Sequence, residues 1–114
     1  MSQHDLETIE LSIKHAKKSV DLMKSVERLT KNRDFKLVVL EGFFEKEAIR
    51  LVTLKADPNM QDAESQEAII KQMDAIGAFR QYLSALIQMG RMAEKAIADD
   101  EATREAILEE ELDA

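Results

Sequence analysis

The run FKLVVLEGFFEKEAIRLVTLKADP, from Phe35 to Pro58, is the densest apolar stretch of the sequence, and it ends at the only proline. Its apolar residues recur at helical spacing and cover adjoining sides as well, which is typical of a helix with several neighbours. We predict one helix over residues 34–56, buried on more than one side, with the other helices packed around it. Pro58 ends this helix because the residue before a proline is displaced from the α-helical region.

The composition favours an all-α protein. The chain has 114 residues, which suits one small domain, and only three glycines and one proline interrupt it. Strong helix formers such as alanine, leucine, glutamate and lysine dominate the rest. There is no cysteine, so disulfides and thiolate metal sites are excluded. The polar, acidic N-terminus does not predict a signal peptide, and no apolar run reaches the ~18 residues of a membrane span.

Two further helices are predicted, one on each side of the central stretch. The first covers about residues 5–31 and has a coiled-coil seam, and the other covers about residues 63–98, where apolar residues recur every seven positions. Residues 30–34 contain no glycine or proline, so either a break or one bent continuous helix fits them. The loop after Pro58 is short and Asp62 is a good N-cap, so the helix that follows should lie antiparallel to residues 34–56.

These elements predict an all-α antiparallel helical hairpin or three-helix bundle with long helices. Residues 1–98 form the helical domain in this interpretation. Residues 99–114 form an acidic C-terminal segment, either a short helix or a tail. Asp99, Asp100 and Glu101 suit the first turn of a new helix better than the end of an old one, because acids stabilise helix N-termini. A kink or break is therefore expected near Asp99.

Two glycines fall at one level of the predicted hairpin. With the turn centred between Asn59 and Met60, Gly42 and Gly77 lie opposite each other. A glycine inside a helix costs about 1 kcal/mol relative to alanine, but it also allows two backbones to approach closely. We predict that the two helices cross tightly at Gly42 and Gly77.

The predicted third helix extends beyond its antiparallel partner by about 20 Å, at 1.5 Å per residue. Its apolar residues there need a cover, which could come from the first helix, from the acidic segment or from another subunit. Self-association is the most economical of these answers, and it predicts a homo-oligomer. The predicted interface residues are Leu86, Ile87, Met89, Met92, Ala93 and Ile97.

Charge is distributed unevenly along the chain. The net formal charge is −7, and residues 99–114 carry all of it, because they contain eight acids and one base, Arg104. Residues 14–36, by contrast, contain eight bases and three acids. This division predicts attraction between head and tail, within one chain or between chains. A solubilising, partly disordered end is the simplest interpretation of the acidic segment, and imitation of a nucleic-acid backbone is the alternative.

No motif for catalysis, metal binding or nucleotide binding is present. His4 and His15, the only histidines, are too far apart along a helix to share a metal ion. Residues 57–67 look only faintly like a calcium loop, since they lack its glycine and its final glutamate. The basic residues have no interleaved aromatic side chains, which argues against nucleic-acid binding. We therefore expect no enzymatic activity, no catalytic residue, no metal and no cofactor.

One block, roughly half of the chain, carries a family resemblance. Its parts are Asp34-Phe35, LEGFF at residues 40–44, LVTLKADP at residues 51–58 and IGA at residues 76–78. In these residues the chain resembles small uncharacterised α-helical proteins of tailed bacteriophages. The resemblance implies a viral accessory or morphogenesis protein that works through protein–protein contacts, and it supplies no catalytic residues.

The sequence thus predicts a non-enzymatic interaction protein, most simply a virion structural or assembly accessory subunit. Its location would be the host cytoplasm or the virion. Its partners would be further copies of itself and a virion or host protein, without a membrane. The alternative is a soluble phage effector that binds and inhibits a host protein, in the manner of an acidic DNA mimic.

Overall fold

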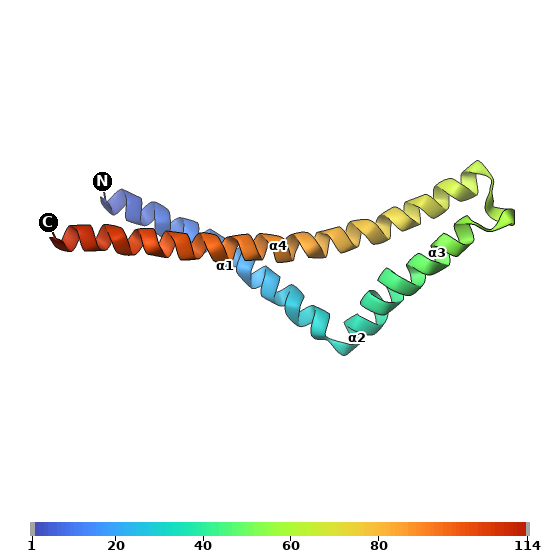
Figure 1. Cartoon of the computed structure of the whole chain (residues 1–114), viewed down its shortest axis with the longest axis horizontal. Helices are drawn as coiled ribbons and strands as arrows, with labels where there is room; N and C mark the ends of the chain where they lie inside the picture. Colours follow the sequence, from blue (N-terminus) through green and yellow to red (C-terminus); the bar gives the residue numbers. More distant parts are fainter. Residues whose placement is uncertain (1, 114) are drawn as a thin grey trace. The chain divides into compact units, whose positions relative to one another are not determined.

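The structure, a computed structural model, describes residues 2–113, and every regular element in that range is helical. The prediction of an all-α protein is therefore confirmed. Figure 1 shows the elements in chain order, which are α1 (Ser2–Lys31), α2 (Arg33–Phe35), η1 (Lys36–Glu47), α3 (Ala48–Lys55), η2 (Pro58–Met60) and α4 (Ala63–Asp113).

Two compact units make up the fold. Unit 1 combines the part of α1 up to Val26 with the part of α4 from Leu86 onward. Unit 2 is continuous in sequence and covers residues 27–85. The long helices α1 and α4 thus contribute residues to both units, and each unit has its own buried cluster.

Unit 1 is an antiparallel pair formed by α1 and the later part of α4, so the N- and C-terminal ends of the chain lie at the same end of this pair (Figure 1). Its core consists of Val20, Met23 and Ala93. Ile13, Val20 and Met23 of α1 are buried on the predicted seam, because residues three and four apart share one helix face. Three partly buried residues pack against this core, namely Ala16, Ile87 and Ile97.

The two helices of unit 1 approach closely at Gly90, which is buried. A Cβ atom at Gly90 would overlap the Cβ of Met23 and would lie 2.6 Å and 2.7 Å from its Sδ and Cγ atoms. Any side chain at this position would therefore push the helices apart. The seven-residue pattern of α4 has a glycine here because the neighbouring helix occupies the space.

The break predicted near Asp99 is wrong, because α4 runs without interruption from Ala63 to Asp113. The hydroxyl of Thr103 donates a hydrogen bond to the carbonyl of Asp99 at 3.0 Å, within the helix. Alanine, leucine and glutamate favour the helix here, and the packed side of unit 1 continues across the acids. The buried or half-buried positions of this side recur at 4-3-4-3 spacing, at residues 93, 97, 100, 104 and 107.

Unit 2 is built on a hairpin of α3 and the first part of α4, as predicted. Leu51, Ile69 and Ile76 form its buried core, and Leu51 is fully buried. An aromatic cluster extends this core, since the Phe79 ring lies 5.4 Å from the Phe44 ring between centroids. The other partly buried residues of the cluster are Phe43, Ala48, Leu54, Met60 and Met73. In each unit the buried cluster joins α4 to the helix that lies antiparallel to it, so the hairpin description holds within each unit.

The first helix and the central stretch are separate helices, not one bent helix. Asn32 alone separates α1 from α2, with φ −69° and ψ 130°. Its side-chain oxygen accepts a hydrogen bond from the Phe35 N–H at 2.9 Å, so Asn32 is the N-cap.

The hairpin turn is closed by polar side chains. The Gln61 and Gln66 side-chain amides each donate a hydrogen bond to the carbonyl of Lys55 at 2.9 Å, which satisfies the C-terminal end of α3. The Asp62 carboxylate accepts from the Ser65 N–H at 2.9 Å, so the predicted N-cap of α4 is confirmed. Hydrogen bonds from Ser65 hold the pKa of Asp62 below its usual value.

The central stretch is not surrounded by other helices, contrary to the prediction. Leu51 is buried in α3, but η1 contains no buried residue. One physical reason is that η1 is a π-helix, in which side chains spaced for an α-helix no longer share one face. Four large apolar side chains of the stretch are between 57% and 67% exposed, namely Leu37, Val38, Ile49 and Val52.

Candidate protein-binding surfaces

An open apolar groove lies between α3 and α4 in unit 2. Its volume is about 220 Å³, and its walls are almost entirely apolar. Val52, which is more than half exposed, forms part of one wall, and Ile49 is exposed one turn before it. We call this surface the α3 groove; its lining residues are Phe44, Ala48, Val52, Met73, Ile76, Gly77 and Arg80.

Gly77 leaves open space in the α3 groove. A Cβ atom added there would meet no atom within 4 Å, apart from its own helix backbone and its chain neighbours. A Cβ added at Gly42 would meet only the carbonyl oxygen of Leu37, at 3.1 Å in its own helix. An added Cβ atom at either glycine would thus meet no atom of another helix within 4 Å, and the predicted crossing at these positions stays a prediction. A close approach of two helices is seen at Gly90.

One cation borders the α3 groove. The guanidinium carbon of Arg80 lies 5.6 Å from the centroid of the Phe44 ring, a cation–π arrangement. Arg50, by contrast, is engaged beside the groove: its Nε donates to both carboxylate oxygens of Glu47, at 3.0 Å and 3.1 Å. The hydrogen bond from Arg50 lowers the pKa of Glu47. The groove thus combines an apolar floor with a positive edge.

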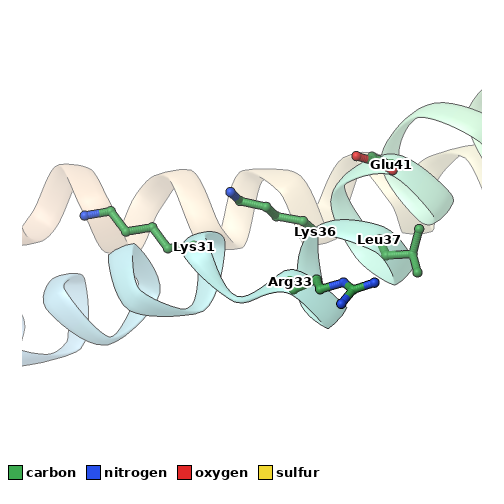
Figure 2. Close-up of a pocket in the computed structure, with 5 residues that line it drawn as sticks. All are labelled: Lys31, Arg33, Lys36, Leu37 and Glu41. Carbon is green, nitrogen blue, oxygen red and sulfur yellow. The ribbon is translucent and has the colours of Figure 1, made fainter.

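A second hollow lies at the helix break and gathers positive charge. Figure 2 shows its side chains: Lys31 comes from the end of α1, Arg33 from α2, and Lys36, Leu37 and Glu41 from η1. The ammonium ends of Lys31 and Lys36 extend in the same direction in this view. The hollow has a volume of about 350 Å³. We call it the basic pocket, since three bases and one acid give it a net charge of +2.

The predicted interface on α4 divides into covered and uncovered residues. Ala93 is buried against α1, and Ile87 and Ile97 pack on the same cluster, so the first helix supplies their cover. Leu86 is half-buried, whereas Met89 and Met92 are more than half exposed. Of the three covers that the sequence allowed, α1 is thus the one observed for the inner side of α4.

The histidines lie apart from these surfaces. His4 lines a shallow hollow of unit 1 together with Ile9, Thr103 and Ile107, and His15 is exposed. Across residues 2–113, no group of three or more histidine, aspartate or glutamate side chains is arranged to hold a metal ion. Within the same range, none of the helices has the length and apolarity needed to cross a membrane.

Comparison with known proteins identifies no relative. No protein-family model matches the chain, and neither a curated protein nor a solved structure is significantly similar to it.

Proposed function

We propose that this chain is a non-enzymatic protein that works through protein–protein contacts and forms homo-oligomers. Its role would be that of a virion structural or assembly accessory subunit of a tailed bacteriophage, in the host cytoplasm or in the virus particle. The observation that carries the proposal is the α3 groove, in which Val52 is exposed and Gly77 leaves open space.

The energetics of the groove support a protein partner. Burial of a valine or isoleucine side chain contributes about 1.5–3 kcal/mol, and exposed apolar patches commonly mark interaction surfaces. Gly77 gives up about 1 kcal/mol of helix stability relative to alanine, with no contact in its own unit that requires a glycine. A partner side chain that enters the groove would need this space.

The phage assignment rests on the resemblance to small proteins of tailed bacteriophages. That resemblance is carried partly by residues 40–44, 51–58 and 76–78. The same segments contribute Phe44, Val52, Ile76 and Gly77 to the α3 groove. The residues that carry the resemblance therefore line the groove as well as the core. This is expected if the similar proteins use the same surface for assembly.

Light scattering over a range of protein concentrations tests the proposal. The mass of the wild type is expected to exceed the 13.0 kDa of one chain and to rise with concentration. Val52→Lys should weaken association by about tenfold or more, because it places a charge in an apolar contact. Gln72→Lys, at an exposed position of α4 outside the groove, adds the same charge and should have no such effect. Detection of the protein in purified virus particles tests the virion role.

The acidic end of α4 supports a second candidate function. Residues 99–113 are helical and carry acids on their exposed sides, so the helix spaces these acids regularly, as a DNA mimic would require. An inhibitor of this kind would be a monomer or simple dimer in the mass measurement. It would also compete with duplex DNA for its host protein.

A further inference from the structure

We infer that the acidic end of α4 in one copy of the chain docks in the basic pocket of a second copy. The inference rests on the self-association proposed above and adds a second contact to the one at the α3 groove. Two surfaces of opposite charge, which lie in different units, carry it.

The basic pocket has the composition of a docking site for an acidic helix. Among the described residues, none forms an ion pair with Lys31, Arg33 or Lys36. Leu37 lies at one end of this lining, next to Arg33, and is 57% exposed, so an apolar side chain adjoins the bases (Figure 2). Protein interfaces commonly combine apolar and polar contacts.

The acidic end of α4 presents a matching surface. Glu101, Glu105, Leu108 and Leu112 follow one another at 4-3-4 spacing, so they lie on one side of the helix. All four are exposed, and the exposed fractions of Leu108 and Leu112 are 42% and 85%. Glu109 lies beside them and is also exposed. We call these five residues the acidic stripe.

The acidic stripe faces away from the packed side of unit 1. The packed side of this segment contains the half-buried residues Asp100, Arg104 and Ile107, and Ile107 shares a hollow with Ile9 of α1. At 100° per residue, the stripe lies roughly 120° around the helix from that side. The stripe is therefore not used within its own unit, and the helix continues to Asp113 with no flexible linker.

Charge complementarity selects a second copy as the occupant. Residues 99–113 carry a net charge of −7, and the basic pocket carries +2. Leucines lie beside acids on the first surface, and a leucine lies beside bases on the second. Opposite potentials orient such an encounter, and the leucines add an apolar contact to it. Nucleic acid, the other polyanion that fits a basic pocket, offers no side chain for Leu37.

The contact joins two different surfaces, so it is heterologous. Such contacts lead to rings or open filaments, unless two copies exchange the contact reciprocally and close as a dimer. The association should weaken as salt rises, because the screening length falls from about 10 Å at 0.1 M salt to about 3 Å at 1 M.

A charge exchange between full-length chains tests the inference. In the pocket variant, Lys31, Arg33 and Lys36 are changed to glutamate. In the stripe variant, Glu101, Glu105 and Glu109 are changed to lysine. Each variant alone should associate at least about tenfold more weakly than the wild type, as measured by sedimentation. An equimolar mixture should associate again, because the acidic pocket of one meets the basic stripe of the other.

Matched controls make the same charge changes elsewhere. Lys14, Lys17 and Lys18 are exposed on α1, and their change to glutamate should leave association within about twofold of the wild type. Asp99, Glu110 and Asp113 are exposed on other sides of the same acidic segment, and their change to lysine should also have a small effect. Circular dichroism of each variant checks that its helices remain folded.

The outcomes separate the inference from the proposed function. A wild type that is monomeric at every concentration overturns both. A wild type that associates, but whose pocket and stripe variants associate as well or are not restored by mixing, overturns the inference alone. A third outcome has two parts: the stripe variant associates like the wild type, and only the pocket variant loses the ability to bind duplex DNA. This outcome would identify nucleic acid as the occupant of the basic pocket and would also overturn the inference.

Discussion

Gly90 and Gly77 are glycines in the interior of the same helix, yet they differ in what surrounds them. At Gly90 a Cβ atom would overlap Met23 of α1, so the antiparallel pair of unit 1 depends on the missing side chain. At Gly77 the same atom would meet nothing within 4 Å, and the glycine borders the open α3 groove. The first glycine is explained by packing inside the chain, and the second is not.

This difference distinguishes the core of the fold from its surfaces for partners. A glycine in a helix interior lowers helix stability, so its presence needs a compensating contact. Unit 1 provides that contact for Gly90. Unit 2 provides none for Gly77, so the compensating contact is expected from a partner that enters the groove.

The largest effect is expected for Gly90→Ala. The added methyl group collides with the Met23 side chain at its Cβ, a backbone-bound atom that cannot rotate away. The helices of unit 1 must separate, and we expect the free energy of unfolding to fall by about 2 kcal/mol, as overpacked cores generally do. Denaturant unfolding followed by circular dichroism measures this change. Unchanged or increased stability would show that the two helices are not closely packed at Gly90.

A smaller effect of opposite sign is expected for Gly77→Ala. The methyl group enters open space and improves helix propensity, so the free energy of unfolding should rise by about 1 kcal/mol. The same variant narrows the α3 groove, so its self-association should weaken while its fold becomes more stable. Light scattering and denaturant unfolding on one sample test both parts. If the variant is less stable than the wild type, the prediction is wrong, and another segment of the chain occupies the space at Gly77.

The smallest effect is expected from titration of Asp62, the N-cap of α4, which is the helix that contains both glycines. The pKa of Asp62 is lowered by hydrogen bonds from Ser65, so the folded state favours its charged form. The charged carboxylate therefore stabilises the folded state at pH values above the ordinary carboxyl pKa of about 4. This stabilisation is lost as the pH falls through the lower pKa that Asp62 has in the folded state. Hydrogen exchange should show the start of α4 loosening at low pH, with residues near Gly90 unaffected. Asp62→Ala should remove this pH dependence, whereas Asp62→Asn should keep the cap at every pH.

Local signals in the sequence predicted much of unit 2. Pro58 and Asp62 define the turn, and the apolar spacing on both sides of it predicts the antiparallel pair around Leu51 and Ile69. The end of the first helix at Lys31 was also correct. These features depend on residues close together in sequence, where caps and periodicity act directly.

The remaining features depend on contacts or backbone geometry that spacing does not encode. The wide winding of η1 changes which side chains share a face, so an α-helical pattern overestimated the burial of Leu37 and Val38. The role of Gly90 appears only when Met23, distant in sequence, is placed beside it. The sequence did contain a signal for this role, because Gly90 falls at a position of the seven-residue apolar pattern of α4. The proposed self-association and its interface stay predictions.

The division into a continuous and a discontinuous unit has a consequence for the order of folding. Unit 2 is formed by residues 27–85 alone, so its helices can pair as soon as that segment has been synthesised. Unit 1 can form only later, because the buried residues of α1 from Ile13 to Met23 pair with residues from Leu86 onward. Contacts between distant segments form slowly, since the intervening chain must first lose entropy. During synthesis on a ribosome, the apolar seam of α1 would therefore emerge first, but it would pack only after the later part of α4 has been made.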